Sequence, residues 1–300
     1  MRFGITILPE YPWPTAAPLW RRAEQLGFDH AWTYDHLVWA GLPNSPWFGT
    51  VPTLTAAATV TSTIRLGTFV TSPNFRHPVS FMRDLLALDD ISGGRIVCGI
   101  GTGGDIDSAV LGGQQLTVRQ RVDRLQEFTE LLDKLLTADH VSSQGTYFSA
   151  NDARTLPGPV QRPRIPFIMA ANGPRSVKLA ARWGQGWVTY GKAGSAEDDD
   201  EWWAGLRELS GRLNDALADQ SRDAGSFERH LNLDGAGSFA LQSVDRFTDM
   251  VGRAAEFGFT DLITHWPRST EPYRGSVDVL EAVATEVLPV ARTIPFRSAH

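Results

Sequence analysis

Short apolar runs alternate with longer segments of helical periodicity along most of the chain. Runs rich in β-branched residues are typical of buried strands, whereas apolar residues three and four positions apart are typical of helices that cover a sheet. The clearest helix is predicted over residues 117–136, where Val118, Val122 and Leu125 follow this spacing. Strands are predicted at 3–8, 31–34, 64–70, 96–100, 166–170, 187–190, 231–233 and 262–265.

A helix is predicted after each of these strands, and the eight strand–helix units predict an α/β fold of the (β/α)8, or TIM, barrel type. Residues 138–165 break the alternation and contain Ser-Ser-Gln-Gly-Thr-Tyr-Phe, so we predict an insertion with a hairpin there. The 300 residues would also allow two domains, but barrels of this length are common as one domain. We therefore expect residues 1–300 to form a single barrel domain with insertion loops. The other helices are expected at 15–26, 54–61, 78–89, from 174, from the acidic run 197–201, 244–257 and 277–290.

Composition excludes several classes of function. The net charge of −6 and the lack of a Lys/Arg-rich block argue against a nucleic-acid partner. No apolar run reaches about 18 residues and no signal-peptide pattern opens the chain, so we expect no membrane span and a cytoplasmic protein. Cys98 is the single cysteine and is expected to be a buried core thiol. The acidic run 197–201 is interpreted as a helix start, and no metal site is predicted.

The candidate chemistry of a (β/α)8 barrel lies in the loops that follow its strands. Asp35 and His36 follow the second predicted strand. Histidine exchanges protons near neutral pH, so His36 is a candidate acid or base. From its position alone, a partly buried histidine bonded to a neighbouring loop is an equally good interpretation.

Gly99, Gly101 and Gly104 fit the pattern G-x-G-x-x-G of dinucleotide-binding folds. That fingerprint normally lies in a doubly wound sheet, whereas strand–helix alternation continues here after the glycines. We therefore favour a different use, in which the missing side chains let a cofactor approach the backbone closely.

Four segments at strand ends occur in a characteristic order: AWTYDH at 31–36, LGTFVTSPNFRHP at 66–78, SGGRIVCGIGTG at 92–103 and MAANGPRS at 169–176. Together they resemble the luciferase-like superfamily of flavin- and deazaflavin-dependent oxidoreductases. Within it the chain is most similar to the branch that uses coenzyme F420, of the F420-dependent glucose-6-phosphate dehydrogenase type. The likeness extends to about residue 290 and is most specific in the first 190 residues.

The resemblance implies roles for particular residues. His36 would be the catalytic acid or base, and a cis peptide would join Phe69 to Val70 beneath the deazaflavin ring. The turn at 172–174 starts a helix, whose free N–H groups can hold a phosphate. The residues implied to bind the cofactor are Asp35, Phe69, Val70, Ser72, Gly101, Thr102, Gly103, Ala171, Asn172 and Gly173.

The candidate substrate residues are Lys192, from the resemblance, and Trp39, from its aromatic neighbours. Lys192 matches a lysine that holds the sugar phosphate in the glucose-6-phosphate dehydrogenases. Those enzymes have a glutamate in the loop after the fourth strand, where this chain has Gly104, with Asp105 and Asp107 in a different register. Trp39 lies among several aromatic residues that predict a broad apolar pocket.

The sequence thus predicts an F420-dependent oxidoreductase that transfers a hydride between the deazaflavin and a small molecule with a C=C, C=N or carbonyl/alcohol group. One alternative is an FMN-dependent monooxygenase that uses reduced flavin and O2, although the serine-rich phosphate loop of such enzymes is not evident. Another is a non-catalytic flavin carrier, against which Asp35, His36 and the long loop after them argue. The resemblance also implies a homodimer.

Overall fold

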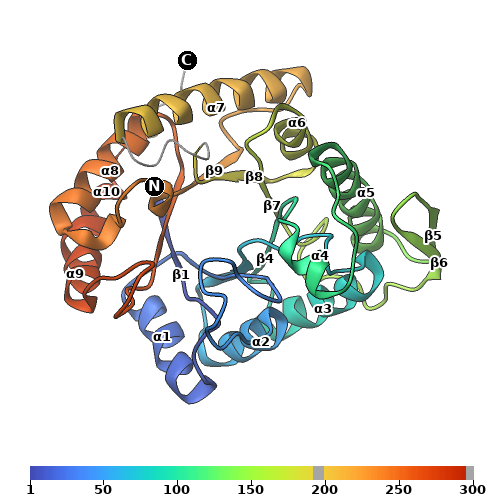
Figure 1. Ribbon diagram of the computed structural model, residues 1–300, viewed down its shortest axis with the longest axis horizontal. Coiled ribbons are helices and arrows are strands. Elements are labelled where there is room, and N and C mark those ends of the chain that lie inside the picture. The colour runs from blue at the N-terminus through green and yellow to red at the C-terminus, as the bar shows by residue number, and fades with distance from the viewer. Residues whose placement is uncertain (192–198, 295–300) are drawn as a thin grey trace. The chain divides into compact units, whose positions relative to one another are not determined.

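The computed structural model describes residues 1–191 and 199–294. Eight strands form a closed barrel in the order β1-β10-β9-β8-β7-β4-β3-β2, and every strand pair with a defined register in it is parallel (Figure 1). The (β/α)8 prediction is confirmed. The strands are β1 (Arg2–Thr6), β2 (His30–Thr33), β3 (Arg65–Thr68), β4 (Ile96–Ile100), β7 (Phe167–Ala170), β8 (Gly186–Thr189), β9 (Glu228–Asn232) and β10 (Asp261–His265).

A helix follows each barrel strand, as predicted, but several boundaries differ. The first helix begins before Thr15 and the second before Leu54, because apolar periodicity reports the buried face of a helix and not its first turn. A short helix, α4 (Ile106–Val110), was not predicted. The other helices are α1 (Trp13–Gln25), α2 (Thr50–Val60), α3 (Pro78–Ser92), α5 (Val118–Thr137), α6 (Pro174–Trp183), α7 (Asp199–Asp219), α8 (Val244–Glu256), α9 (Val277–Ala282) and α10 (Leu288–Ala291), the last two joined by the π-helical turn Val283–Val287.

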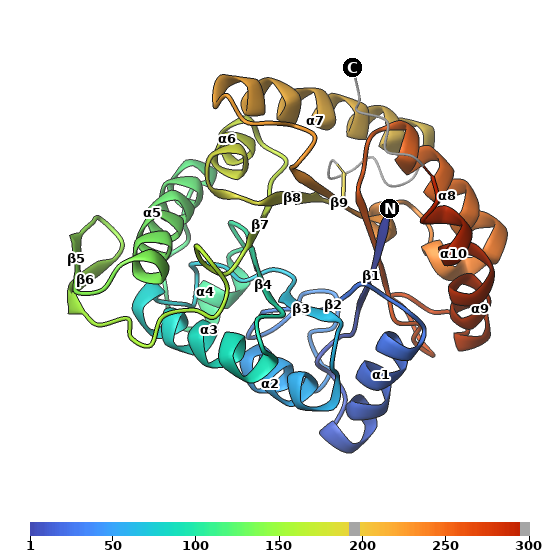
Figure 2. The same ribbon diagram turned by 180° about the vertical axis from the view of Figure 1, so that it is seen from behind.

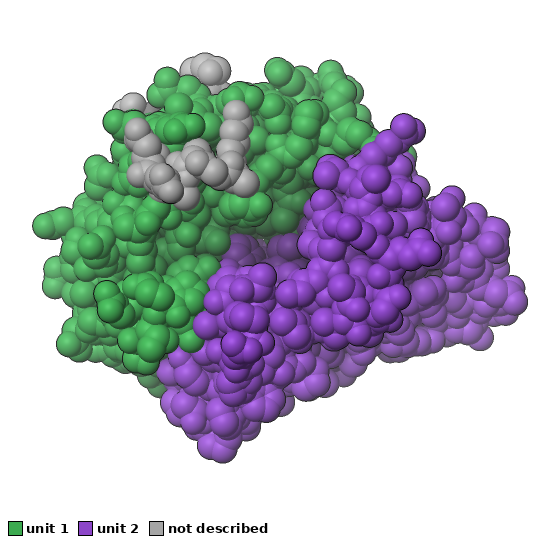
Figure 3. Space-filling model, in the orientation of Figure 1, with its two compact units in different colours: residues 1–8, 22–31, 168–300 green, residues 9–21, 32–167 purple. Residues whose placement is uncertain are grey.

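Contacts divide the chain into two compact units (Figure 3). Unit 1 comprises residues 1–8, 22–31 and 168–300, and unit 2 comprises residues 9–21 and 32–167. The expectation that residues 1–300 form one domain stays a prediction. Among the described residues, no helix combines the length and the apolar character that crossing a bilayer requires.

The predicted hairpin is confirmed in unit 2, where β5 (Val141–Gln144) and β6 (Ser149–Ala153) pair antiparallel beside α5 (Figures 1 and 2). Glu127 of α5 accepts hydrogen bonds from the turn, at 3.0 Å from the N–H of Thr146 and 2.8 Å from that of Tyr147. The helix carboxylate therefore holds the turn in place. Cys98 of β4 is fully buried, and burial raises the pKa of its thiol, which confirms the core interpretation.

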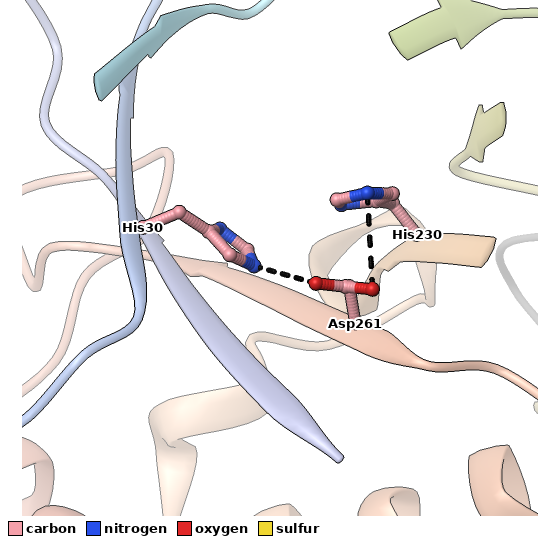
Figure 4. A group of neighbouring side chains, drawn as sticks. All are labelled: His30, His230 and Asp261. Carbon is pink, nitrogen blue, oxygen red and sulfur yellow. Dashed lines mark hydrogen bonds and ion pairs between the residues drawn. The ribbon is translucent and has the colours of Figure 1, made fainter. Parts of the chain in front are cut away.

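A buried ionic cluster lies at the amino-terminal ends of barrel strands in unit 1 (Figure 4). The strand register sets Asp261 of β10 opposite Arg2 of β1 on one side and His230 of β9 on the other. Arg2 donates from Nε and Nη2 to the two carboxylate oxygens of Asp261, both at 2.8 Å. His30 Nε2 lies 3.1 Å from one oxygen and His230 Nε2 lies 3.8 Å from the other.

The ligand atoms of His30, His230 and Asp261 lie within 4.8 Å of one another, close enough for a metal ion. Both Asp261 oxygens, however, accept hydrogen bonds from Arg2, and Thr260 Oγ1 donates to one of them at 2.6 Å. A cation would have to displace a guanidinium, so we assign the cluster a structural role. It also lies at the end of the strands opposite to the one where barrels of this type place their chemistry.

Asp261 generates a prediction about acid stability. Burial alone would raise its pKa, but interactions with His230, His30 and Arg2 outweigh burial and hold the pKa well below its usual range. The pKa of Asp261 is lower in the folded than in the unfolded chain, so the ionised carboxylate stabilises the fold. This contribution to the free energy of unfolding is fully present above about pH 4 and is lost as the pH falls through the folded-state pKa. Asp261→Asn should lower the free energy of unfolding by ~2–3 kcal/mol at pH 7. The loss should be smaller than for a fully buried ion pair, because the side chain of Arg2 is partly exposed to water.

Chemical denaturation between pH 7 and pH 3 would measure this difference, which should shrink below about pH 4. Asp219→Asn is the matched control, because Asp219 forms an exposed pair with Lys178 at 3.6 Å and should change stability by less than ~0.5 kcal/mol. Equal effects of the two substitutions would contradict the structural role of the cluster.

Candidate active site

In unit 2 the histidine that follows β2 is paired with an aspartate of α4. His36 Nδ1 lies 2.7 Å from Asp107 Oδ2, and the N–H of Leu37 donates to Asp107 Oδ1 at 2.7 Å. The His36 side chain is 20% exposed, whereas that of Asp107 is fully buried. One buried carboxylate therefore orients the imidazole and holds the backbone beside it. With Nδ1 engaged, Nε2 is the ring nitrogen left for proton exchange.

The pairing partner of His36 was missed in the sequence. By resemblance, Asp105 and Asp107 lie near the place of a glutamate in the loop after the fourth strand of the glucose-6-phosphate dehydrogenases, in a different register. In the structure Asp107 is paired with His36, and Asp105 lies 3.0 Å from Arg121. Because 71 residues separate His36 from Asp107 and α4 is short, no local pattern predicted the contact. The one indication in the sequence was that His36 and Asp107 both follow the carboxyl ends of predicted strands.

Asp35 forms a two-pronged ion pair with Arg76. Arg76 donates from Nε at 2.9 Å and from Nη2 at 2.7 Å to the two oxygens of a buried carboxylate. The Arg76 guanidinium also lies 5.0 Å from the ring centre of Phe75 and 4.9 Å from that of Phe81. The structure thus shows Asp35 fixing the segment after β3, and its predicted contact with a cofactor stays a prediction.

The segments after β3 and β4 approach each other closely in unit 2. The cis peptide expected between Phe69 and Val70 is present. A Cβ added to Gly99 would lie 2.0 Å from the carbonyl oxygen of Thr68, so only glycine fits there. Gly103 has a φ of 62°, and a Cβ there would lie 2.6 Å from the hydroxyl of Ser72. These glycines serve close backbone packing within a barrel, which rules out the doubly wound dinucleotide fold.

Three buried polar atoms at this end of unit 2 have no hydrogen-bond partner among the described residues: Thr33 Oγ1, Thr71 Oγ1 and Asn74 Oδ1. Asn74 is nevertheless fixed, because its Nδ2 donates to the carbonyls of Thr102 at 3.1 Å and Gly104 at 2.6 Å. Buried polar groups are normally hydrogen-bonded. The three atoms, all at or after the carboxyl ends of strands, are therefore candidate contacts for a polar ligand.

In unit 1 the side chain of Asn172 links the loops after β7 and β8. Its Nδ2 donates to the carbonyl of Gly191 at 2.7 Å, and its Oδ1 accepts from Thr189 Oγ1 at 2.6 Å. The carbonyl of Ala171 accepts from Trp187 Nε1 at 2.6 Å, and Gly173 caps α6 without a side-chain hydrogen bond. The cofactor roles of residues 171–173 stay predictions, and Lys192 lies outside the described residues.

A second His–Asp pair, also missed in the sequence, lies in unit 1 at the carboxyl end of β10. His265 Nδ1 is 2.7 Å from Asp234 Oδ2, and its ring stacks on that of Tyr273 with centres 3.7 Å apart and planes 4° from parallel. His265 is fully buried. The pair therefore anchors the loop after β10 and differs from His36, which reaches the surface.

Aromatic side chains gather next to His36, as the sequence predicted for the loop after β2. Trp39 packs edge-on against Tyr34 with centres 5.0 Å apart, and lies 6.1 Å from the ring of Trp47. Trp47 Nε1 donates to the carbonyl of His36 at 2.9 Å. The substrate role of Trp39 stays a prediction; Trp39 packs on Tyr34, whose ring centre lies 6.2 Å from that of His36.

Two adjacent glycines offer a direct test of the close packing after β4. Gly103→Ala should lower the free energy of unfolding by at least ~1–2 kcal/mol, because it combines a positive φ with a steric clash. Gly104→Ala is the control and should change it by less than ~0.5 kcal/mol, because a Cβ there meets no atom within 4 Å among the described residues. Thermal unfolding of both variants would measure the difference, and equal stability would contradict the packing described here.

Known proteins share parts of this sequence and this fold. The F420-dependent hydroxymycolic acid dehydrogenase of Mycobacterium tuberculosis is 34% identical over 175 residues, which are 57% of this chain and 47% of that protein. An F420-dependent glucose-6-phosphate dehydrogenase of Microbacterium testaceum is 33% identical over 174 residues, 56% of this chain and 49% of that protein. The chain thus spans about half the length of the curated relatives it matches.

Solved structures extend the likeness to nearly the whole fold. An F420-dependent secondary alcohol dehydrogenase, determined in complex with an F420–acetone adduct, superposes with a TM-score of 0.81. The match covers 97% of this chain and 99% of that one, and at 18% identity it shows a shared fold. The model of the luciferase-like monooxygenase family matches residues 1–222, most of the sequence. The chain therefore belongs to the luciferase-like monooxygenase family.

Proposed function

We propose that this protein is an oxidoreductase that uses coenzyme F420 to transfer a hydride to or from a small organic molecule. The observation that carries the proposal is the His36–Asp107 pair, a partly exposed imidazole oriented by a buried carboxylate after β2. The names of the relatives, F420-dependent dehydrogenases, support the choice of cofactor. A homodimer in the cytoplasm completes the proposal, and light scattering would test the dimer.

The residues of unit 2 suit a flat cofactor with polar edges. Thr33, Thr71 and Asn74 offer two hydroxyls and one amide oxygen that are buried and unpaired among the described residues. At Gly99 and Gly103 the missing side chains let the segments after β3 and β4 pack against each other, which brings Ser72 and Asn74 beside Gly103. We propose that the three unpaired atoms, with Asp35, Ser72 and residues 69–70 and 101–103 of the same unit, hold F420. When bound, the deazaflavin supplies hydride transfer at its central ring carbon.

His36 is proposed to move the proton that accompanies the hydride. When a carbonyl is reduced, the carbon gains a hydride and the oxygen gains a proton from His36 Nε2. When an alcohol is oxidised, Nε2 accepts that proton instead. Asp107 keeps the ring oriented for both directions. The rings of Trp39 and Trp47 lie close together in the segment after His36, and Trp47 is tied to the His36 backbone.

The description of the family model favours one other candidate, a monooxygenase that uses reduced FMN and O2. Titration of the protein with F420 and separately with FMN, followed by tryptophan fluorescence, distinguishes the two. We expect F420 to bind at least tenfold more tightly than FMN. Preference for FMN, with oxygen consumption, would support the monooxygenase, and binding of neither would contradict both.

Substitutions at the pair test the mechanism. His36→Ala should lower kcat about 100-fold or more, because proton transfer by a positioned side chain contributes about that much. Asp107→Asn keeps an oxygen for the Leu37 N–H but removes the charge beside the imidazole, so we expect kcat to fall ~10–100-fold with KM and F420 affinity nearly unchanged. Stopped-flow measurement of F420 absorbance would give these values.

The control for Asp107→Asn is Asp105→Asn, which removes a nearby aspartate paired with Arg121. It should leave kcat within about twofold of the wild type. If Asp107→Asn raised KM and left kcat unchanged, or if both variants lost activity equally, a role of Asp107 in positioning His36 would be wrong.

A further inference from the structure

Two segments that begin directly after His36 and Asp107 lack charged side chains. Residues 37–49 and 108–118 contain no Asp, Glu, Lys, Arg or His. Both segments are attached to the pair: the first begins at Leu37, whose N–H donates to Asp107, and the second begins directly after Asp107. Trp47, within the first, donates to the carbonyl of His36. On the side of these two segments, the pair in unit 2 therefore has no charged neighbours in the chain.

These two segments also expose apolar side chains to an unusual degree. Five of the eleven exposed large hydrophobic residues of the described chain lie in these 24 positions, and their exposed fractions run from 37% to 69%. Scattered apolar residues are normal on a surface, but such a concentration marks a binding surface. The five are Leu37, Phe48, Val110, Leu111 and Val118.

The arginines that flank the segments each lie next to a carboxylate, and Arg119, which directly follows the second segment, is exposed and lies 3.9 Å from Asp123. Arg76 is bound by both oxygens of Asp35, and Arg121 lies 3.0 Å from Asp105. Asp107 itself carries a negative charge beside His36. A substrate with a phosphate group would meet these carboxylates and an apolar surface in unit 2.

We propose that the substrate is an uncharged molecule with an apolar chain or ring of several carbons next to the reacting carbonyl or alcohol, and that Leu111 and its apolar neighbours bind that part. This inference rests on the proposed function, because it names the substrate class of the same site. It argues against a sugar phosphate as the substrate.

A homologous series tests the proposal without the cofactor. Binding of the ketones from butan-2-one to nonan-2-one would be measured by isothermal titration calorimetry on the whole protein. Each methylene that leaves water should tighten binding about threefold to fourfold. Glucose 6-phosphate, measured in the same way, should bind at least tenfold more weakly than nonan-2-one.

Two matched substitutions locate the binding surface. Leu111→Lys places a charge among the apolar residues. It should reduce the gain in ketone affinity per added methylene to less than twofold. Val290→Lys alters an equally exposed apolar residue of α10 in unit 1 and should leave the series unchanged. Affinity independent of chain length, equal effects of the two substitutions, or tighter binding of glucose 6-phosphate would each overturn the proposal.

The outcomes separate this inference from the proposed function. F420 titration of the same preparation decides the cofactor, whatever the ketone series shows. If F420 binds and glucose 6-phosphate binds more tightly than the ketones, the substrate class is wrong and the F420 oxidoreductase stands. If the ketones follow the expected series and F420 does not bind, the apolar surface stands and the proposed cofactor is wrong.

Discussion

The buried carboxylate of Asp107 is the contact on which the candidate chemistry depends. It receives the imidazole of His36 and the N–H of Leu37, so that it joins the segment after β2 to the segment after β4. Asp35, the residue before His36, is tied in the same unit to Arg76 after β3. Adjacent residues at one strand end are thus held by two different loops. Because a buried charge is stable only while it is paired, these contacts also stabilise the loops themselves.

The structure contains several His–Asp pairs, and exposure distinguishes their roles. His30 and His265 are buried, and each holds strands or a loop together within unit 1. His140 pairs with Asp152 on the hairpin, where both side chains are more than half exposed and water screens the interaction. His36 combines a buried carboxylate with a partly exposed ring. Proton exchange with a substrate needs both properties, because the ring must be fixed and must also be reached.

The sequence predicted the parts of the fold that depend on local pattern. Strand β4 has the bounds expected from its apolar run, and α6 begins at Pro174, where proline suits the first helical turn. Helix α4 escaped prediction because five residues carry too little periodicity to be recognised. The partner of His36 escaped for another reason: a contact between residues 71 positions apart depends on the closed barrel, which brings strand ends together.

The negative charge of Asp107 affects which substrates can bind next to His36. The carboxylate of Asp107 disfavours a phosphate group placed close to it. A neutral ketone avoids this repulsion and gains from each apolar group that it buries against the uncharged segments. Charge develops on the ketone oxygen only as hydride arrives, and His36 then supplies the proton that neutralises it. The same carboxylate that orients His36 therefore also selects against substrates that are already anionic.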